Sequence, residues 1–389
     1  MQGFVSLCVL EPGMPEHRAA AIADSTLERA YGHAIHKAFY GLPNVDVVAL
    51  ADPLAEPRAE RAAEIGNPKE YDDYRDMLAA EQPDLVAICP HHFEHHGRWL
   101  LEVIASGVKG IYIEKPITAS LEEADAVVAA ADAAGTKIAV AHQNRYRPGM
   151  RHIRDLVRNG DLGTLKYMNA MGKCDKRGGT HDLRVLGTHL LDALRFIAGD
   201  VAWATGHMQK NGRDVVVGDV FEGPEGLGEM AGDALAGYFA FESGAIARFD
   251  SYARESGGGT GWFGFELWGT EAGIWVRDGG RSVYRYPSGA FTPGDASLRW
   301  ERLDAPEILN PDGTVAEDPQ LLDALNHYAT ADVVDCVENG GEPVSSAREA
   351  TAALEMIMAI LEGQRTGARV NFPMETRQNP LGLWVQESQ

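Results

Sequence analysis

Two groups of ionisable residues in this sequence have the types and spacing needed to move a proton. Glu114-Lys115-Pro116 closes a short apolar run, so the lysine stands at the end of a predicted strand. A lysine in that position can hydrogen-bond a hydroxyl and favour its deprotonation, and the proline fixes the turn that aims it. His189 and Asp192 are three residues apart, which places them on one face of a predicted helix. Histidine titrates near neutrality and can shuttle the proton of an alcohol.

Lys115 and His189 together suit an oxidation in which a hydride and a proton leave separately. The hydride would go to a nicotinamide cofactor, and the proton needs an acceptor on the protein. Each group also has a structural interpretation: EKP can be a solvated turn, and His189 can be a core histidine bonded to Asp192. A nucleotide site upstream favours the catalytic interpretation.

The stretch from Asp24 to His33 is the predicted first turn of that nucleotide site. Glycines in such a turn let the backbone approach a pyrophosphate at a helix N-terminus. Here the turn reads ADSTLERAYGH and retains one glycine, so Ser25 and Thr26 would donate hydroxyls to phosphate while Gly32 gives close approach. The residues expected to hold the cofactor in this turn are Asp24, Ser25, Thr26, Tyr31, Gly32 and His33.

Three later strand ends complete the predicted cofactor site. Asp52 ends the second strand, where a carboxylate accepts hydrogen bonds from ribose hydroxyls and repels a 2′-phosphate, so NAD is favoured over NADP. Pro90 and His91 follow the next strand and are expected to border the cofactor. Glu114 is expected to hold the Lys115 ammonium or the nicotinamide region.

The histidine-rich run from His91 to His96 raises the possibility of a metal site. His92 and His96 would share a face of a helix, and imidazole is a common ligand of zinc and related metals. The run also lies where a doubly wound sheet places its nicotinamide loop. We therefore expect no metal here and expect His96 to help start the next helix.

The elements that must position these residues follow from the apolar pattern. In the first third, strands are predicted at 18–24, 45–53, 83–90, 109–116 and 136–143, with helices at 31–41, 54–65, 97–107 and 120–135. Continuous apolar strands separated by helices predict an α/β Rossmann fold, a doubly wound parallel sheet with ligands at the carboxyl ends of its strands.

After Pro148 the pattern changes to longer strands. Those at 234–243, 244–253, 261–269 and 273–279 are predicted to form an antiparallel meander, and helices at 149–159, 185–198, 319–338 and 346–364 accompany it. The domain organisation expected is a disordered lead-in at 1–17, an NAD(P)-binding Rossmann domain at 18–147 and an α+β substrate-binding and oligomerisation domain at 148–389.

The bulk composition excludes several partners. The net charge of −22 over 389 residues repels phosphate backbones and anionic lipid heads, so we expect neither nucleic acid nor membrane as a partner. The four cysteines form no CxxC pair, which indicates reduced thiols and a cytoplasmic protein.

From Ala20 to about Leu381 the chain resembles the glucose–fructose oxidoreductase/inositol dehydrogenase (Gfo/Idh/MocA) family. The resemblance rests on VVALADP, GIYIEKP, AHQNRYRP and GTHLLD, and on the EKP and HxxD groups at this separation. It implies a Rossmann domain followed by a domain with a large open-faced, mainly antiparallel sheet. It also implies NAD(P)-linked oxidation of sugars or polyols, Lys115 and His189 as the catalytic pair, and a homodimer or homotetramer formed through the open sheet.

Two departures from the family pattern affect the site. The first turn resembles that of a subgroup with an extended, glycine-poor turn, and Val185 stands where many members have a substrate-contacting aspartate four residues before the histidine. Asp182 is expected to take over part of that catalytic role. The resemblance places Asn144 at the cofactor, and the residues expected to bind substrate beside Lys115, Asp182 and His189 are Arg145, Tyr146, Lys173, Asp175, Arg177 and His181.

Three functions are compatible with these features. The first is a dehydrogenase that moves a hydride between a secondary hydroxyl of a sugar, glycoside or polyol and nicotinamide. The second is an NAD-dependent glycosidase or lyase that oxidises its sugar transiently and releases no NADH. The third is a non-catalytic sugar- or nucleotide-sensing regulator, against which Lys115 and His189 argue, because a sensor needs neither group.

Overall fold

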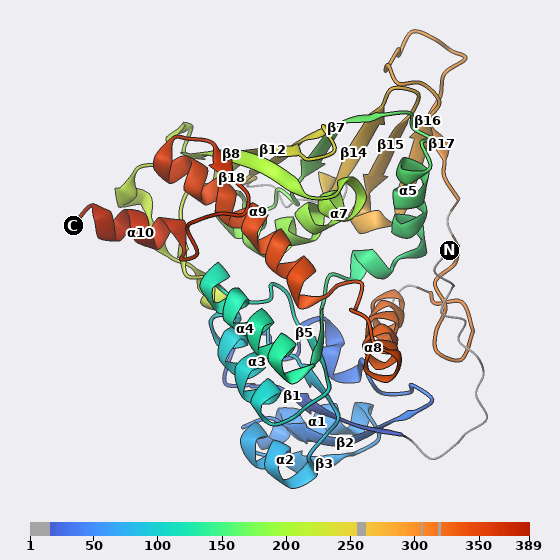
Figure 1. Ribbon diagram of the computed structural model, residues 1–389, viewed down its shortest axis with the longest axis vertical. Coiled ribbons are helices and arrows are strands. Elements are labelled where there is room, and N and C mark those ends of the chain that lie inside the picture. Colours follow the sequence, from blue (N-terminus) through green and yellow to red (C-terminus); the bar gives the residue numbers. More distant parts are fainter. Residues whose placement is uncertain (1–15, 255–261, 305, 318–319) are drawn as a thin grey trace. The chain divides into compact units, whose positions relative to one another are not determined.

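The computed structural model describes residues 16–254, 262–304, 306–317 and 320–389, which fall into two compact units (Figure 1). The first fifteen residues of the predicted lead-in lie outside the described residues. Most of the first unit precedes Tyr146, but Glu307–Arg348 also belongs to it. The second unit comprises Ala119–Glu122, Arg147–Pro306 and Glu349–Gln389. A single domain boundary after residue 147 does not account for Glu307–Arg348, which returns to the first unit.

The first unit is built on a parallel sheet whose strand order is β3-β2-β1-β4-β5-β6. This order, with β1 at the centre and the chain moving outward in both directions, is that of a doubly wound sheet, and the predicted Rossmann fold is confirmed. The strands are β1 (His17–Ile22), β2 (Val45–Ala51), β3 (Lys69–Tyr71), β4 (Leu85–Ile88), β5 (Gly110–Ile113) and β6 (Lys137–Val140).

Helices cover this sheet, and one of them comes from far along the chain. Four follow the strands in sequence: α1 (Ala55–Glu64), α2 (Tyr74–Glu81), α3 (His96–Ala105) and α4 (Leu121–Ala134). The fifth, α8 (Leu321–Asn339), packs against β5 and β6 (Figure 1). Its buried residues Leu325, Ala329 and Val333 join the same apolar core as Tyr112 of β5.

The second unit contains a larger mixed sheet in the order β17-β16-β15-β14-β7-β13-β12-β8-β18, with β9 paired to β8. Neighbouring strands run antiparallel except β7 and β13, which are parallel. The predicted simple meander is therefore wrong at one point, because β7 separates β13 from β14. The strands are β7 (Leu165–Met171), β8 (Val201–Lys210), β9 (Arg213–Asp214), β12 (Ala234–Phe241), β13 (Ile246–Tyr252), β14 (Gly264–Gly269), β15 (Gly273–Arg277), β16 (Ser282–Tyr286), β17 (Glu301–Arg302) and β18 (Val370–Asn371).

One face of this sheet is covered by helices and the other is more open. Burial alternates along β12 and β13, as expected for strands with a single buried face. One covering helix is α7 (Thr188–Ala198), which packs against β7. Another is α9 (Ala347–Thr366), whose Ile360 packs directly on glycines of β8 and β12. Two further helices are α5 (Pro148–Arg158) and α10 (Pro380–Glu387). No helix in the described part of the chain is long and apolar enough to cross a bilayer.

The predicted helix at 31–41 is the clearest local error. The segment instead forms a short 3-10 helix, η1 (Gly32–Lys37), in which His33 and Ala34 have φ values of +46° and +55°. Left-handed backbone costs a residue with a Cβ roughly 1–2 kcal/mol, so tertiary contacts must hold these two residues.

Candidate active site

Lys115 is buried at the carboxyl end of the parallel sheet. It follows the last residue of β5 by two positions, and only 1% of its surface is exposed. Its Nζ atom lies 2.9 Å from Nε2 of His91, which stands three residues beyond β4. Because β4 and β5 are parallel neighbours, their ends bring these two predicted site residues together.

Glu114 organises the other side of this group. Its carboxylate is fully buried, accepts a hydrogen bond from the backbone N–H of Lys115 at 2.7 Å and pairs with Nδ1 of His33. Burial alone would raise the pKa of Glu114, but its interactions with His33, His91 and Lys115 prevail and hold the pKa well below the usual range. The carboxylate therefore stays ionised among basic side chains.

Asp52 holds the first turn in place. Its Oδ2 accepts hydrogen bonds from the Ser25 hydroxyl at 2.5 Å and the Tyr31 hydroxyl at 2.7 Å. Its Oδ1 accepts from the backbone N–H groups of Ser25 and Leu54. The predicted ribose ligand is therefore buried and already bonded to the turn. Burial together with the hydrogen bond to Asp52 raises the pKa of Tyr31 far above its usual value.

The rest of the turn is also bonded internally. The Thr26 hydroxyl, expected at a phosphate, donates to Asp24. The backbone N–H of Gly32 donates to the carbonyl of Cys89, and that of His91 donates to Arg29, so the turn is fastened to the end of β4. Gly32 has no room for a side chain, because a Cβ there would lie 2.7 Å from Oε1 of Glu114.

His96 connects the two loops that carry His91 and Lys115. Its ring nitrogens lie 2.8 Å from the carbonyl oxygens of Pro90 and Pro116. Burial lowers the pKa of His96 to about 4, although both carbonyls favour protonation. The neutral ring carries one N–H, so one of the two carbonyls receives it. Sequence reasoning assigned His96 only to a helix start, and the histidine run gave no further signal.

Arg145 and Tyr146, expected at the substrate, fasten the returning segment of the first unit. Nη1 of Arg145 donates to the carbonyl of Val344 at 3.0 Å, and the Tyr146 hydroxyl donates to Asp332 at 2.9 Å. Both residues are almost fully buried. Asn144 is partly buried in the same 3-10 turn, η3 (Gln143–Tyr146).

Asn326, on α8, is a supporting residue that sequence reasoning missed. Its amide donates to the carbonyl of His33 at 2.9 Å and its oxygen accepts from the Tyr112 hydroxyl at 2.8 Å. It thus supports the turn that presents His33 to Glu114. No local pattern could reveal this, because almost 300 residues separate the partners.

In the second unit Asp182 is buried and bonded to backbone. It lies in the short helix α6 (Gly179–Asp182), and its carboxylate accepts from the N–H groups of Lys173 and Cys174 and from the Ser251 hydroxyl at 2.6 Å. These contacts close the loop after β7. Asp182 therefore has a structural role in addition to the catalytic role that was expected of it.

The other residues of this unit that were expected to bind substrate include an ion pair between Arg177 and Asp175. Arg177 makes a two-pronged contact with Asp175, whose pKa is lowered to about 2 mainly by that hydrogen bond. Nζ of Lys173 lies 3.8 Å from the same carboxylate. Burial, with the charge of Arg177, lowers the pKa of His181. The charges of this loop are therefore largely matched within it.

His189 lies in the first turn of α7, directly after a π-helical segment, η4 (Leu183–Gly187). Its side chain is 9% exposed. Extra-wide helical turns of this kind occur often at functional sites, because they re-aim the residues around them. Val185, at the position where a carboxylate was expected, is buried within this segment.

Arg184, in the same segment, is a buried cation that sequence reasoning missed. Its Nη2 donates to the carbonyl of Ala119 at 2.9 Å, and burial lowers its pKa to about 10. The signal that could have found it is an arginine inside an otherwise apolar helical run.

Comparison with known proteins agrees with the fold. Residues 26–142 match the model of the Gfo/Idh/MocA proteins, described as an oxidoreductase family with an NAD-binding Rossmann fold. Over this segment the chain is similar to the family. Among its relatives is D-apiose dehydrogenase of Paraburkholderia graminis, 26% identical over 350 residues that cover 86% of this chain and 85% of that protein.

Further Gfo/Idh/MocA relatives extend the likeness over both units. The 1,5-anhydro-D-fructose reductase of Ensifer adhaerens is 26% identical over 371 residues, covering 90% of this chain and 97% of that protein. A levoglucosan dehydrogenase solved with NADH and L-sorbose superposes with a TM-score of 0.72 at 17% identity, covering 93% of this chain and all of that one. At that identity the structural match concerns the fold.

The first unit has the fold of the NAD-binding family whose model it matches. The bare backbone at Gly32 lets the start of η1 pack directly against the Glu114 carboxylate, because a Cβ there would lie 2.7 Å from Oε1. The carboxylate of Asp52 at the end of β2 disfavours a 2′-phosphate. The residues that would hold the cofactor are those of the first turn, the ends of β2 and β4, and Glu114.

Proposed function

We propose that this protein is an NAD-dependent dehydrogenase that moves a hydride between a secondary hydroxyl of a small carbohydrate or polyol and nicotinamide. The observation that carries the proposal is the buried contact of 2.9 Å between Lys115 and His91 at the end of a family-typical NAD-binding sheet. Two relatives, named D-apiose dehydrogenase and 1,5-anhydro-D-fructose reductase, act on carbohydrates by their names, which supports the substrate class.

The proposed chemistry assigns separate tasks to separate residues. Lys115 donates a hydrogen bond to the reacting oxygen and favours the negative charge that develops on it. Glu114 stays ionised and holds the lysine in place by accepting a hydrogen bond from its backbone N–H. His189 accepts the proton of the hydroxyl, a task that neutral imidazole performs near neutral pH. NAD, when bound, accepts the hydride from the carbon.

The decisive experiment measures NADH formation with a panel of pentoses, hexoses, anhydro sugars and cyclitols. We expect turnover with at least one substrate, and a loss of roughly 10²–10⁴-fold in Lys115→Ala and in His189→Ala with NAD binding retained. Lys109→Ala is the matched control, since Lys109 is exposed and paired with Asp84. Unchanged turnover in Lys115→Ala would overturn the proposal. Following glycoside cleavage in the same assay separates net oxidation from transient oxidation.

We also propose that the protein self-associates through the open face of the larger sheet. Aromatic rings gather on β14–β16 and the following loop, where Trp268 contacts Tyr286, Phe291 and Trp300. Phe291 is 56% exposed in the single chain. Light scattering should give a mass of two or four chains, and a monomer at all concentrations would contradict this.

A further inference from the structure

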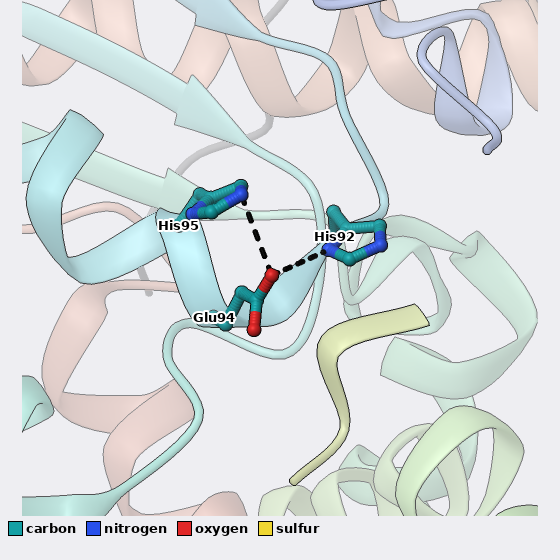
Figure 2. Close-up of side chains that lie close together, drawn as sticks. All are labelled: His92, Glu94 and His95. Atoms are coloured by element: carbon teal, nitrogen blue, oxygen red, sulfur yellow. Dashed lines mark ion pairs between the residues drawn. The ribbon is translucent and has the colours of Figure 1, made fainter. Parts of the chain in front are cut away.

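The loop between β4 and α3 holds a compact group of potential metal ligands, His92, Glu94 and His95 (Figure 2). Both histidine side chains turn toward the glutamate, with Nδ1 of His92 and Nε2 of His95 each 3.4 Å from the same oxygen, Oε1. The three ligand atoms all lie within 4.8 Å of one another. The group belongs wholly to the first unit and is separate from the contact between His91 and Lys115.

Hydrogen bonding does not explain this arrangement. Charge-assisted N–H···O bonds are usually about 2.7–2.9 Å long, well below the two separations found here. Nδ1 of His92 is buried and has no hydrogen-bond partner within the described residues. Nδ1 of His92 is thus held beside the Glu94 carboxylate without a hydrogen bond.

The two separations from the histidine nitrogens to Oε1 do match a coordination shell. Ligand atoms about 2.0–2.1 Å from a tetrahedral Zn²⁺ lie roughly 3.4 Å from one another. We propose that His92, Glu94 and His95 bind a divalent ion of the zinc type, with water as the fourth ligand. The sequence suggested His92 and His96 as the possible metal-binding pair, and it favoured a cofactor-bordering loop because the run lies where a doubly wound sheet places its nicotinamide loop. The structure instead turns His96 inward and pairs His92 with His95.

The charge of the group suits a metal cation. The carboxylate of Glu94 places a negative charge beside both imidazole rings. The carboxylates of Glu94 and Asp24 add negative potential at His95. About half of the Glu94 side chain is exposed, so an ion can enter and keep a water ligand.

A bound ion would act on the loop that carries His91. His92 follows His91 directly, and His95 precedes His96, whose ring lies against the carbonyls of Pro90 and Pro116. Metal binding by this group would therefore fix the segment that carries His91, the hydrogen-bond acceptor of Lys115. The site is structural or regulatory in this position, since its ligands are not the residues assigned to the reaction.

A second candidate cluster, Glu16, His17 and Glu338, provides a matched control. There Nε2 of His17 is already 2.9 Å from Oε1 of Glu338, and the Asn44 amide donates to the same oxygen. His17 and Glu338 thus have partners without a metal.

The test titrates the full-length, untagged and chelator-treated protein with Zn²⁺ by calorimetry. We expect about one ion per chain, and we expect Co²⁺ to give the intense visible absorption of a four-coordinate site. Glu94→Gln and His92→Gln should each weaken binding at least about tenfold, while Glu338→Gln leaves it unchanged. Glu94→Gln guards against misfolding, because its side chain is half exposed.

Three outcomes would overturn the inference. These are no stoichiometric binding, binding that survives in both Glu94→Gln and His92→Gln, or binding that is lost only in Glu338→Gln. Thermal unfolding of each variant without metal shows whether a loss of binding reflects a loss of folding.

Discussion

Nζ of Lys115 lies 2.9 Å from Nε2 of His91, and both side chains are buried. An ammonium group can only donate, so Nε2 must accept and the proton of the neutral imidazole must sit on Nδ1. The backbone N–H of His91 is in turn bonded to the carbonyl of Arg29. The orientation of the proposed catalytic lysine is thus set by a neighbouring strand end and by the first turn.

His91→Phe should therefore slow catalysis without abolishing cofactor binding. The phenyl ring retains the packing against Phe93 but offers no acceptor. A hydrogen bond to a charged group contributes roughly 1.5–3 kcal/mol, so we expect kcat to fall about ten- to a hundredfold. Steady-state kinetics and an NAD titration check this. His91→Gln retains an acceptor and should recover part of the rate, and a fully active phenylalanine variant would contradict the role.

Glu114→Gln should alter how stability depends on acid. The folded pKa of Glu114 lies below its ordinary value of 4.5, so on acidification the unfolded chain takes up the proton first. The stabilisation is complete above that ordinary value and is lost as pH falls toward the folded pKa. Thermal unfolding at several pH values should show wild type well above the variant near neutrality, with the gap narrowing below about pH 4. A gap independent of pH would argue against an ionised Glu114.

Asp182→Ala should mainly destabilise the second unit. It leaves one buried and one partly buried backbone N–H group and the Ser251 hydroxyl without their acceptor, which we expect to cost about 3–5 kcal/mol. Ser251→Ala removes one of these bonds and should cost about 1 kcal/mol. Denaturant unfolding measures both. If Asp182 instead serves catalysis first, its variant will fold normally and lose turnover.

His96 should make the protein less stable in mild acid. Its folded pKa of about 4 lies below the ordinary 6.5, so between these values the unfolded chain binds a proton that the folded chain does not. Stability should therefore fall as pH drops through this window. His96→Gln should flatten the decline in Tm, though only in part, because burial also lowers the pKa of His36 to about 4. A slope that does not change would show that His96 titrates normally.

The parts of the site set by strand ends were predictable from sequence. An apolar run followed by a charged residue predicts both a buried strand and its exit, and this pattern alone is enough to place Lys115, Glu114 and His91 at one sheet edge. The parallel sheet, and the antiparallel pairing of most strands in the larger sheet, were predictable for the same reason. These features depend on residues close together in the chain.

The parts set by distant partners were not predictable. Residues 31–41 have a helical pattern, yet Asp52 and Glu114 hold Tyr31 and His33 and force a tighter turn. Asp182 resembles a substrate ligand until Ser251, nearly seventy residues later, is seen beside it. Local propensity contains no information on such pairings.

The return of Glu307–Arg348 to the first unit has a consequence for how the protein is made. The core beneath β5 and β6 is completed by Leu325, Ala329 and Val333, which leave the ribosome only after every strand of the larger sheet except β18 has been synthesised. Domains usually fold in the order of their synthesis. Part of the apolar surface of the nucleotide-binding unit therefore stays uncovered until α8 has been synthesised. A chain that ends after Tyr146 would lack this helix.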